Sequence, residues 1–536
     1  MTMAAMVALA CGSTTSNEGP PDSTPPVTTP SVTVTVRVDQ GRSPISPYIY
    51  GSNQDDGTDV WTLRRLGGNR LTGYNWENND SNAGKDFEHS SDLFLVANEE
   101  LPASDAAIPA RVVTHFHDLS VVMGAQSIVT LQMAGYASAD ARGTVQPSET
   151  APSARWVRVE ARKPSAFTVN PDLTDSAVYM DELVNLLVQR YGGAASATGV
   201  RFYNLDNEPA LWPSTHPRIH PQPVGAAELI GRSVTLASAV KAVDARAEIV
   251  APAAYGMAEF VSMQDAPDWS AVKAGYEWYI DYYLDGMREA EQTSGTRLLD
   301  VLDVHWYPEA RGDNRIIDAT ATTANDAAAR LQAPRSLWDS SYHESSWIAQ
   351  SLPAFLPLLP KLQHSIAQYY PSTKLGISEY DYGGGTTVSG GIAQADVLGI
   401  FGERGVYLAA HWGVSATRPY TSAGFKLYRN YDGQRAVYGS TAVRTETSDV
   451  SRTSVHAAIN GSDPSEVHVI LLSKEPRDTL VVRVQLTGGA SYSSAQAWGF
   501  DGASPAITAR AGVTSIAGNS FDYAVPPLTA LHLVVR

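Results

Sequence analysis

Residues 200–212, VRFYNLDNEPALW, hold a short apolar run that stops abruptly at an acidic residue. Val200–Leu205 has the length and composition of a buried strand. Pro209 lacks an N–H and ends the strand, and it also keeps the preceding residue, Glu208, out of helical geometry. The segment therefore predicts a strand with a carboxylate at its C-terminal end.

Similar short apolar runs recur across the middle of the chain and alternate with helical stretches such as Ser176–Tyr191. Alternating strands and helices indicate a parallel α/β architecture, and a (β/α)₈ barrel over residues 48–418 suits the length. In such a barrel the chemistry lies where strands end and loops begin. The other predicted strands are Ser127–Gln132, Ala247–Ala251, Leu299–His305, Lys374–Ser378 and Val406–Trp412.

The two ends of the chain follow a different pattern. Ser31–Asp39 alternates Val with Thr or Arg, which is typical of a half-buried antiparallel strand. Short β-branched runs return at Val467–Leu472, Thr479–Leu486 and Leu528–Val535. We therefore expect a β-sandwich domain built from an N-terminal strand, residues 31–47, and a C-terminal segment, residues 419–536.

The first thirty residues predict export. Residues 1–11 resemble a bacterial lipoprotein signal, with Cys11, the only cysteine, following a short apolar run. Residues 12–30 are a Pro/Thr-rich linker that cannot form a core. The expected location is secreted or lipid-anchored through Cys11 at the bacterial cell surface. A single cysteine also excludes an intrachain disulfide.

The charge balance narrows the choice of partners. The chain has 39 basic and 56 acidic residues, a formal charge of −17, and no basic run. A nucleic-acid partner is therefore disfavoured. A neutral polysaccharide fits, and we expect a monomer.

A second strand-end carboxylate pairs with Glu208. The segment KLGISEYDYGGG, which starts at Lys374, places Glu379 at the end of another strand. Retaining glycosidases need two carboxyl groups about 5–5.5 Å apart, one protonated and one ionised. Two glutamates at strand ends predict this pair, with Asn207 bonding the sugar's 2-hydroxyl. The alternative for Glu208 alone is a structural turn carboxylate.

Aromatic residues at other strand ends predict a sugar-binding cleft. His305, Trp306 and Tyr307 stand where a strand stops before proline, and Trp412 ends the last predicted strand. Trp306, Trp412 and Trp212 would stack on sugars. A phenol near the nucleophile would hydrogen-bond it and lower its pKa. The alternative for each is a core aromatic residue or a structurally bonded histidine.

With these motifs in view, the chain resembles glycoside hydrolase family 44, endoglucanases and xyloglucanases of the retaining (β/α)₈-barrel clan. The resemblance covers about residues 45–430. It rests on five segments: IYGSN (Ile49–Asn53), RRLGGNRLTGYNWENNDSNAGKDFEH (Arg64–His89), YNLDNEPALW, DVHWYP and GISEYDYGGG.

The resemblance implies roles for individual residues. It makes Glu208 the acid/base, Glu379 the nucleophile and Arg70 the cation that holds the nucleophile's charge. It places in the cleft Asn75, Trp76, Asn207, Tyr255, His305, Tyr307 and Trp412. Catalysis needs no cofactor, although some family members carry a structural calcium or zinc. Glu77, Asp80, Asp86 and Glu88 are the acidic residues near a loop that would suit such an ion, and solvated loop carboxylates are the alternative.

The implied activity is hydrolysis of β-1,4-glucan chains, as cellulose-type glucan or xyloglucan. Two alternatives remain open from the sequence. One is a related retaining enzyme that acts on mannan or xylan. The other is a non-catalytic carbohydrate-binding protein, which the presence of both glutamates disfavours.

Overall fold

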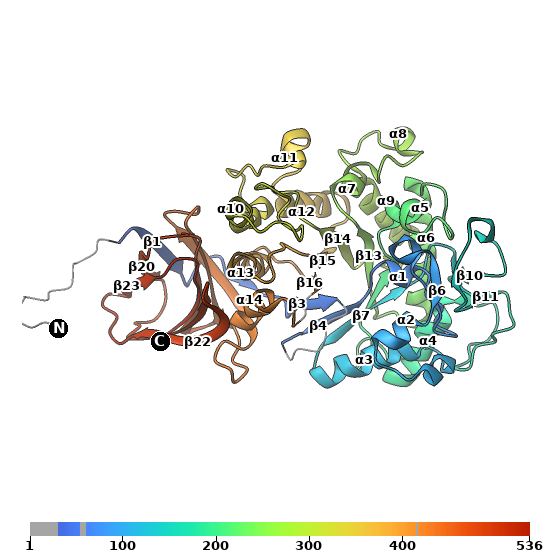
Figure 1. Cartoon of the computed structure of the whole chain (residues 1–536), viewed down its shortest axis with the longest axis horizontal. Helices are drawn as coiled ribbons and strands as arrows, with labels where there is room; N and C mark the ends of the chain where they lie inside the picture. Colours follow the sequence, from blue (N-terminus) through green and yellow to red (C-terminus); the bar gives the residue numbers. More distant parts are fainter. Residues whose placement is uncertain (1–29, 54–59, 414–415) are drawn as a thin grey trace, which may run out of the picture.

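The chain forms two domains, a barrel and a sandwich, which lie side by side along its long axis (Figure 1). The computed structural model describes residues 30–53, 60–413 and 416–536. The predicted signal segment with Cys11, and the linker up to residue 29, lie outside the described residues.

Eight strands close into a parallel barrel, which confirms the predicted fold. Each strand pairs in parallel with both neighbours, and the last pairs with the first. Every apolar run that was predicted as a barrel strand forms one. In order around the barrel the strands are β3 (Tyr48–Asn53), β4 (Leu63–Leu66), β7 (Gln126–Leu131), β12 (Phe202–Leu205), β13 (Glu248–Ala254), β14 (Val301–Trp306), β15 (Lys374–Tyr380) and β16 (Leu408–Trp412).

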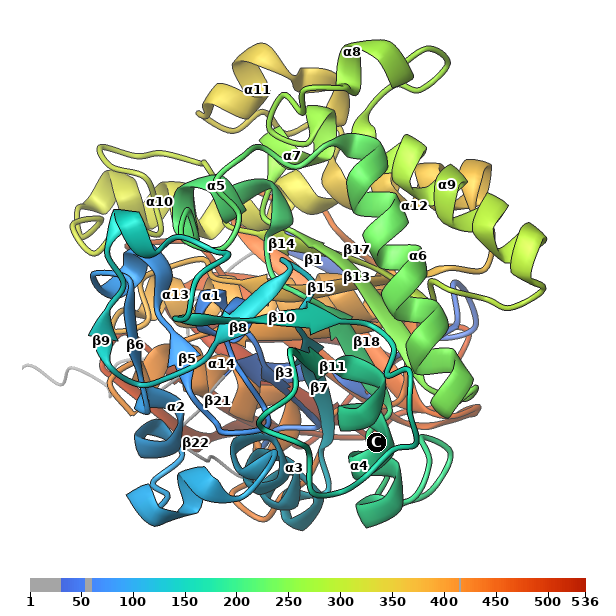
Figure 2. The ribbon, with the colours of Figure 1, turned by 90° about the vertical axis from the view of Figure 1, so that its right-hand side faces the viewer.

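Helices follow the strands and cover the outside of the barrel (Figure 2). The long ones are α3 (Arg111–Met123), α4 (Met180–Tyr191), α6 (Ala226–Val243), α9 (Tyr279–Ser294), α12 (Leu358–Tyr369), α13 (Val388–Glu403) and α14 (Pro419–Arg429). Shorter ones lie in the loops: α1 (Asn69–Thr72), α2 (Phe94–Asn98), α5 (Trp212–Thr215), α7 (Met257–Ser262), α8 (Trp269–Val272), α10 (Ala324–Gln332) and α11 (Trp347–Ser351). Among the residues that the structure describes, none of the helices is long and apolar enough to span a membrane.

The barrel interior changes from apolar to polar toward the C-terminal ends of its strands. The lower layer is a closed apolar cluster of Leu63, Ile128, Phe202, Val250, Val301 and Leu408. Side chains two residues further along a strand point the same way. On β4, β12 and β14 these residues are Arg65, Asn204 and Asp303, and all three are fully buried. A polar layer therefore lies directly beneath the mouth of the barrel.

Two small sheets in the loops after β4 and β7 lie beside the barrel (Figure 2). A hydrogen bond of 2.8 Å between the hydroxyls of Ser138 and Ser91 joins them. One sheet contains β5 (Ser81–Asn82), β6 (Ser90–Asp92) and β9 (Gly143–Thr144), and the other contains β8 (Tyr136–Ser138), β10 (Trp156–Glu160) and β11 (Ala177–Tyr179).

The sandwich is built from both ends of the chain, as predicted. Strand β1 (Val32–Arg37) alternates buried valines with half-buried residues, and it lies between β17 and β20. The valines join an apolar core made with the C-terminal strands. The other strands are β2 (Ser43–Pro44), β17 (Thr441–Thr447), β18 (Thr453–Asn460), β19 (Asp463–Ser473), β20 (Leu480–Thr487), β21 (Ala495–Asp501), β22 (Ser504–Val513), β23 (Ser520–Val525) and β24 (Ala530–Val535).

Candidate active site

Glu208 stands just beyond the end of β12, on a backbone that other residues hold in an uncommon conformation. Asp206 and Glu208 both have positive φ, 61° and 45°, which non-glycine residues rarely adopt. The buried Asp206 carboxylate accepts hydrogen bonds from the Thr72 hydroxyl and from the N–H groups of Met133, Ala134 and Asn207. These bonds offset the strain and fix Glu208 over the mouth of the barrel.

Glu379 lies near the end of β15, opposite His305 of β14 in the strand register. Its Oε1 accepts a 2.6 Å hydrogen bond from Nη1 of Arg65, and its Oε2 accepts a 2.9 Å bond from the Tyr307 hydroxyl. Only 6% of the Glu379 side chain is exposed. The contact predicted between a phenol and this carboxylate is present.

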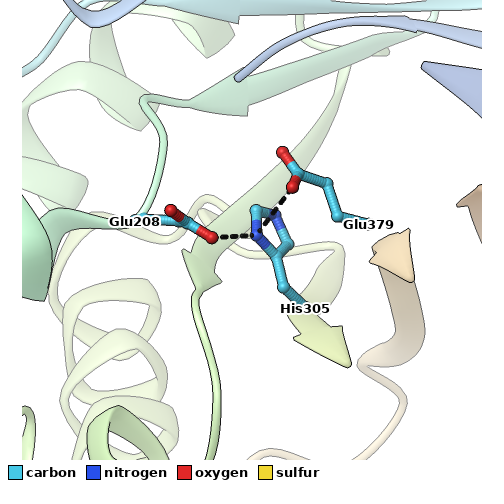
Figure 3. A group of neighbouring side chains, drawn as sticks. All are labelled: Glu208, His305 and Glu379. Atoms are coloured by element: carbon cyan, nitrogen blue, oxygen red, sulfur yellow. Dashed lines mark hydrogen bonds and ion pairs between the residues drawn. The ribbon is translucent and has the colours of Figure 1, made fainter. Parts of the chain in front are cut away.

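His305 lies between the two glutamates (Figure 3). Its Nδ1 is 2.9 Å from Oε1 of Glu208 and 3.5 Å from Oε2 of Glu379. One ring nitrogen of His305 and one carboxyl oxygen from each glutamate all lie within 4.8 Å of one another. The two carboxyl groups, one just beyond β12 and one on β15, therefore converge beside His305.

The prediction for Arg70 is wrong, because Arg65 is the cation that binds Glu379. Arg65 is fully buried on β4 and also donates to the side-chain oxygens of Asn53, Asn204 and Asn207, at 2.9–3.1 Å. Arg70 lies on α1 and instead pairs with Asp92 at 2.5 Å and with Ser81. The strand ends at Leu66, so Arg70 is already part of the loop.

The cleft beside Glu208 is a cavity of about 290 Å³. Tyr255, Trp306 and Tyr307 line it, as predicted, although Trp306 is only 2% exposed and presents little of its ring. Trp347 on α11 also lines the cavity and is 43% exposed. Sequence reasoning missed Trp347, since it lies in a long loop after β14 and not at a strand end.

Several predicted cleft residues have structural roles instead. Trp76 and Trp212 are fully buried, with indole N–H groups bonded to the carbonyls of Tyr179 and Asn207. Asn75 is buried and bridges the Ser138 carbonyl and the Glu77 N–H. The predictions that Trp76 and Asn75 line the cleft, and that Trp212 stacks on sugar, are therefore wrong.

Two other predicted residues do lie at the barrel mouth. Trp412 ends β16, and its ring lies so close to Gly68 that a Cβ there would come within 2.6 Å of it. Asn207 bonds Arg65 through its oxygen and Asn69 through its nitrogen. Its proposed bond to a sugar hydroxyl stays a prediction.

The surroundings of the site shift the pKa values of its ionisable groups in different directions. Burial raises the pKa of Glu208 to about 7, although the charge of Arg65 opposes the shift. Burial also lowers the pKa of His305 and raises that of Tyr307 well above its ordinary value. One carboxyl of the pair is thus suited to hold a proton near neutral pH, as a general acid requires.

One group of side chains in the described part of the chain has the residue types that could hold a metal ion. Within the described residues, it is the only group of three or more His, Cys, Asp or Glu side chains whose nitrogen and oxygen atoms converge, and it consists of Glu208, His305 and Glu379. The Arg65 guanidinium already binds Oε1 of Glu379, and Oε2 of the same carboxyl group lies on the side of His305. In the loop after β4, burial is the main cause that raises the pKa of Glu77 to about 8 and that of Asp80 to about 6.

Comparison with known proteins places this site in a family. The model of glycoside hydrolase family 44 matches residues 79–310. An endoglucanase A from Paenibacillus lautus is 53% identical over 94% of this chain and 72% of its own length. The chain belongs to glycoside hydrolase family 44.

Solved structures agree with this assignment. A family 44 xyloglucanase from Paenibacillus polymyxa, solved with xyloglucan, is 51% identical with a TM-score of 0.93, over 94% of this chain and 99% of that one. A family 44 endoglucanase from Clostridium thermocellum gives the same identity, coverage and TM-score. The chain is therefore a glycoside hydrolase, and the family predicted from the motifs is confirmed.

Proposed function

We propose that this enzyme is a retaining endo-β-1,4-glucanase that hydrolyses cellulose-type glucan or xyloglucan, with Glu208 as acid/base and Glu379 as nucleophile. The observation that carries the proposal is the placement of the two carboxyl groups with oxygens within 4.8 Å. This separation suits a covalent intermediate, since an inverting pair stands about 6.5–9.5 Å apart to admit a water molecule.

The mechanism proceeds in two displacements. Glu379 attacks the anomeric carbon while Glu208 gives its proton to the leaving oxygen, and a glycosyl ester forms on Glu379. The negative charge of Glu379 is then gone, and Glu208 is ionised. Glu208 next removes a proton from water, the water attacks the anomeric carbon, and Glu379 leaves as a carboxylate. Both residues return to their first state with the β configuration retained.

Arg65 and Tyr307 support the attacking group. Arg65 places a positive charge beside Glu379 and fixes one of its oxygens, and the Tyr307 hydroxyl holds the other. Two bonds on one carboxylate restrict its rotation and aim it at a bound sugar. The relatives named endoglucanase and xyloglucanase support a β-1,4-glucan as that sugar chain.

A substrate panel tests the proposal. We expect release of short oligosaccharides from carboxymethylcellulose and xyloglucan, and much slower release from mannan and xylan. Glu208→Gln and Glu379→Gln are each expected to lose about 10³-fold or more of kcat while still binding the polymer. Faster hydrolysis of mannan or xylan would instead favour the related-enzyme alternative. A wild-type protein that binds glucan without turnover would favour the non-catalytic one.

The rate should also fall in mildly alkaline solution. Because the pKa of Glu208 is raised to about 7, ionisation above that pH removes the proton that the leaving group needs. We expect kcat/KM to decline above about pH 7 in a profile measured from pH 4 to 9. A profile that stays flat to pH 9 would contradict the role of Glu208 as general acid.

A further inference from the structure

A continuous chain of polar groups runs from the barrel interior to the acid/base residue. Oδ2 of Asp303 is 2.7 Å from the Ser378 hydroxyl, which is 3.2 Å from Nε2 of His305. Nδ1 of His305 is 2.9 Å from Oε1 of Glu208. Asp303, Ser378 and His305 are fully buried, so their hydrogen bonds are made to one another and not to bulk water.

The direction of each bond follows from a count of protons. The Asp303 carboxylate can only accept, and it takes bonds from the Ser378 N–H, the Ser378 hydroxyl and the Asn204 amide. Ser378 has one hydroxyl proton, which goes to Asp303 across the shorter contact. The Ser378 oxygen can then only accept from His305, so Nε2 of His305 must carry a proton.

This assignment fixes the other ring nitrogen. In a neutral imidazole with its proton on Nε2, Nδ1 has a lone pair. That lone pair faces Oε1 of Glu208, and the contact is favourable only if this oxygen carries a proton. Glu379 is not the partner of this lone pair, since its nearer oxygen is 3.5 Å from Nδ1 of His305, against 2.9 Å for Oε1 of Glu208.

We propose that Asp303 and Ser378 are positioning residues that hold His305 in its Nε2–H tautomer, so that Nδ1 accepts a hydrogen bond from the protonated carboxyl of Glu208. The proposal rests on the proposed role of Glu208 as acid/base. The chain of bonds stabilises the neutral form of this carboxyl between turnovers, and a bond to the neutral form favours it over the ionised one. After the proton is given to the leaving group, Nδ1 and Glu208 no longer attract one another, which frees Glu208 to accept a proton from water.

Other charged and titratable groups surround this chain of hydrogen bonds. The groups that interact electrostatically with Glu208 or His305 are Arg65 on β4, Asp86 in the loop after α1, Tyr255 and Glu259 around α7, Asp303 and Tyr307 at β14, and Glu379 on β15. A change at Ser378 removes no charge from this set. Its effect on the acid/base is therefore transmitted through the tautomer of His305.

The direct test is neutron diffraction from crystals of the whole enzyme in D₂O below pH 6. We expect deuterium on Nε2 but not on Nδ1 of His305, on Oε1 of Glu208, and on the Ser378 oxygen in the direction of Asp303. Deuterium on Nδ1 of His305, alone or together with Nε2, would overturn the proposal.

The functional test is the pH profile of Ser378→Ala. Without the Ser378 hydroxyl, His305 is free to adopt either tautomer. The alkaline limb of the kcat/KM profile is then expected to move to lower pH by about 0.5–1 unit, which corresponds to the loss of one hydrogen bond. Ser378→Thr, which restores the hydroxyl, should return the limb toward the wild-type position. An unchanged limb in Ser378→Ala would contradict the positioning role.

Ser127→Ala is the matched control. Ser127 is a buried serine on β7 whose hydroxyl bonds Nδ1 of the buried His117 at 2.9 Å, away from the site. This variant should lose stability without a shift of the alkaline limb of kcat/KM.

Failure of this proposal and failure of the proposed function give different results. If Glu208→Gln remains active, the acid/base assignment fails. If Glu208→Gln is inactive and the Ser378→Ala limb stays in place, only the positioning chain fails.

Discussion

At the scale of single residues, the strand-end glutamates were predictable and the cation that binds Glu379 was not. Glu208 is revealed by the proline that follows it, and Glu379 by the glycine run after Tyr382. Arg65 stands beside Arg64 in a run of four buried residues. Only the position of Leu63 in the interior layer shows that Arg65 points inward, while Arg64 bonds the Phe116 carbonyl and Ser120 on α3.

Arg65→Ala should therefore inactivate the enzyme, and Arg70→Ala should not. Removal of Arg65 leaves the buried Glu379 without its cation and three asparagines without a donor, so we expect kcat/KM to fall about 100-fold or more. Arg70→Ala breaks an ion pair with Asp92 in the loop and should stay within about threefold of wild type. Equal losses in kcat/KM for the two variants would contradict the assignment of Arg65.

At the scale of elements, the periodicity of the sequence located strands but could not show what covers a helix. Helix α13 is buried from Ser389 to Gly402, because it lies between the barrel and the sandwich. The sequence shows only a helix that is apolar on every side. The residues that pack against α13 explain why glycine is needed in it: a Cβ on Gly399 would lie 2.2 Å from the ring of His456 on β18.

Gly399→Ala should accordingly destabilise the protein, against the usual preference of helices for alanine. The added methyl group must displace His456 or α13, and we expect the free energy of unfolding to fall by about 1–3 kcal/mol. Gly231→Ala in α6 is the control, because no atom beyond its chain neighbours and the backbone of its own helix lies within 4 Å of its Cβ position. That variant should gain up to about 1 kcal/mol. Urea unfolding in which both variants gained stability would refute the packing.

At the scale of the whole molecule, a buried ion cluster joins the two domains. His456 lies between Glu403 and Asp396 of α13, at 2.9 Å from each, and Lys474 lies 2.8 Å from Asp396. Burial opposes the charge of His456, but the two carboxylates prevail and raise its pKa to about 9. The sequence predicted that both chain ends form the sandwich, yet it could not pair residues so far apart.

This cluster should make stability depend on pH. An unfolded histidine has a pKa of about 6.5, so the contribution of His456 is complete below that pH and is lost as the pH rises through about 9. We expect His456→Gln to cost about 3 kcal/mol at pH 6 and clearly less at pH 10, by urea unfolding. His117→Gln is the control, since its difference should not shrink over this range. A His456→Gln difference that is equal at pH 6 and pH 10 would count against the cluster.

The proposed covalent bond between Glu379 and the sugar can be detected by trapping of the glycosyl-enzyme intermediate. A 2-deoxy-2-fluoro-cellotrioside with an activated leaving group forms the ester quickly and releases it slowly, so the labelled residue can be found by peptide mass spectrometry. We expect one label, on the peptide that contains Glu379, and no label in Glu379→Gln. A label on Glu208, or turnover of glucan to an α-configured product without any label, would contradict it.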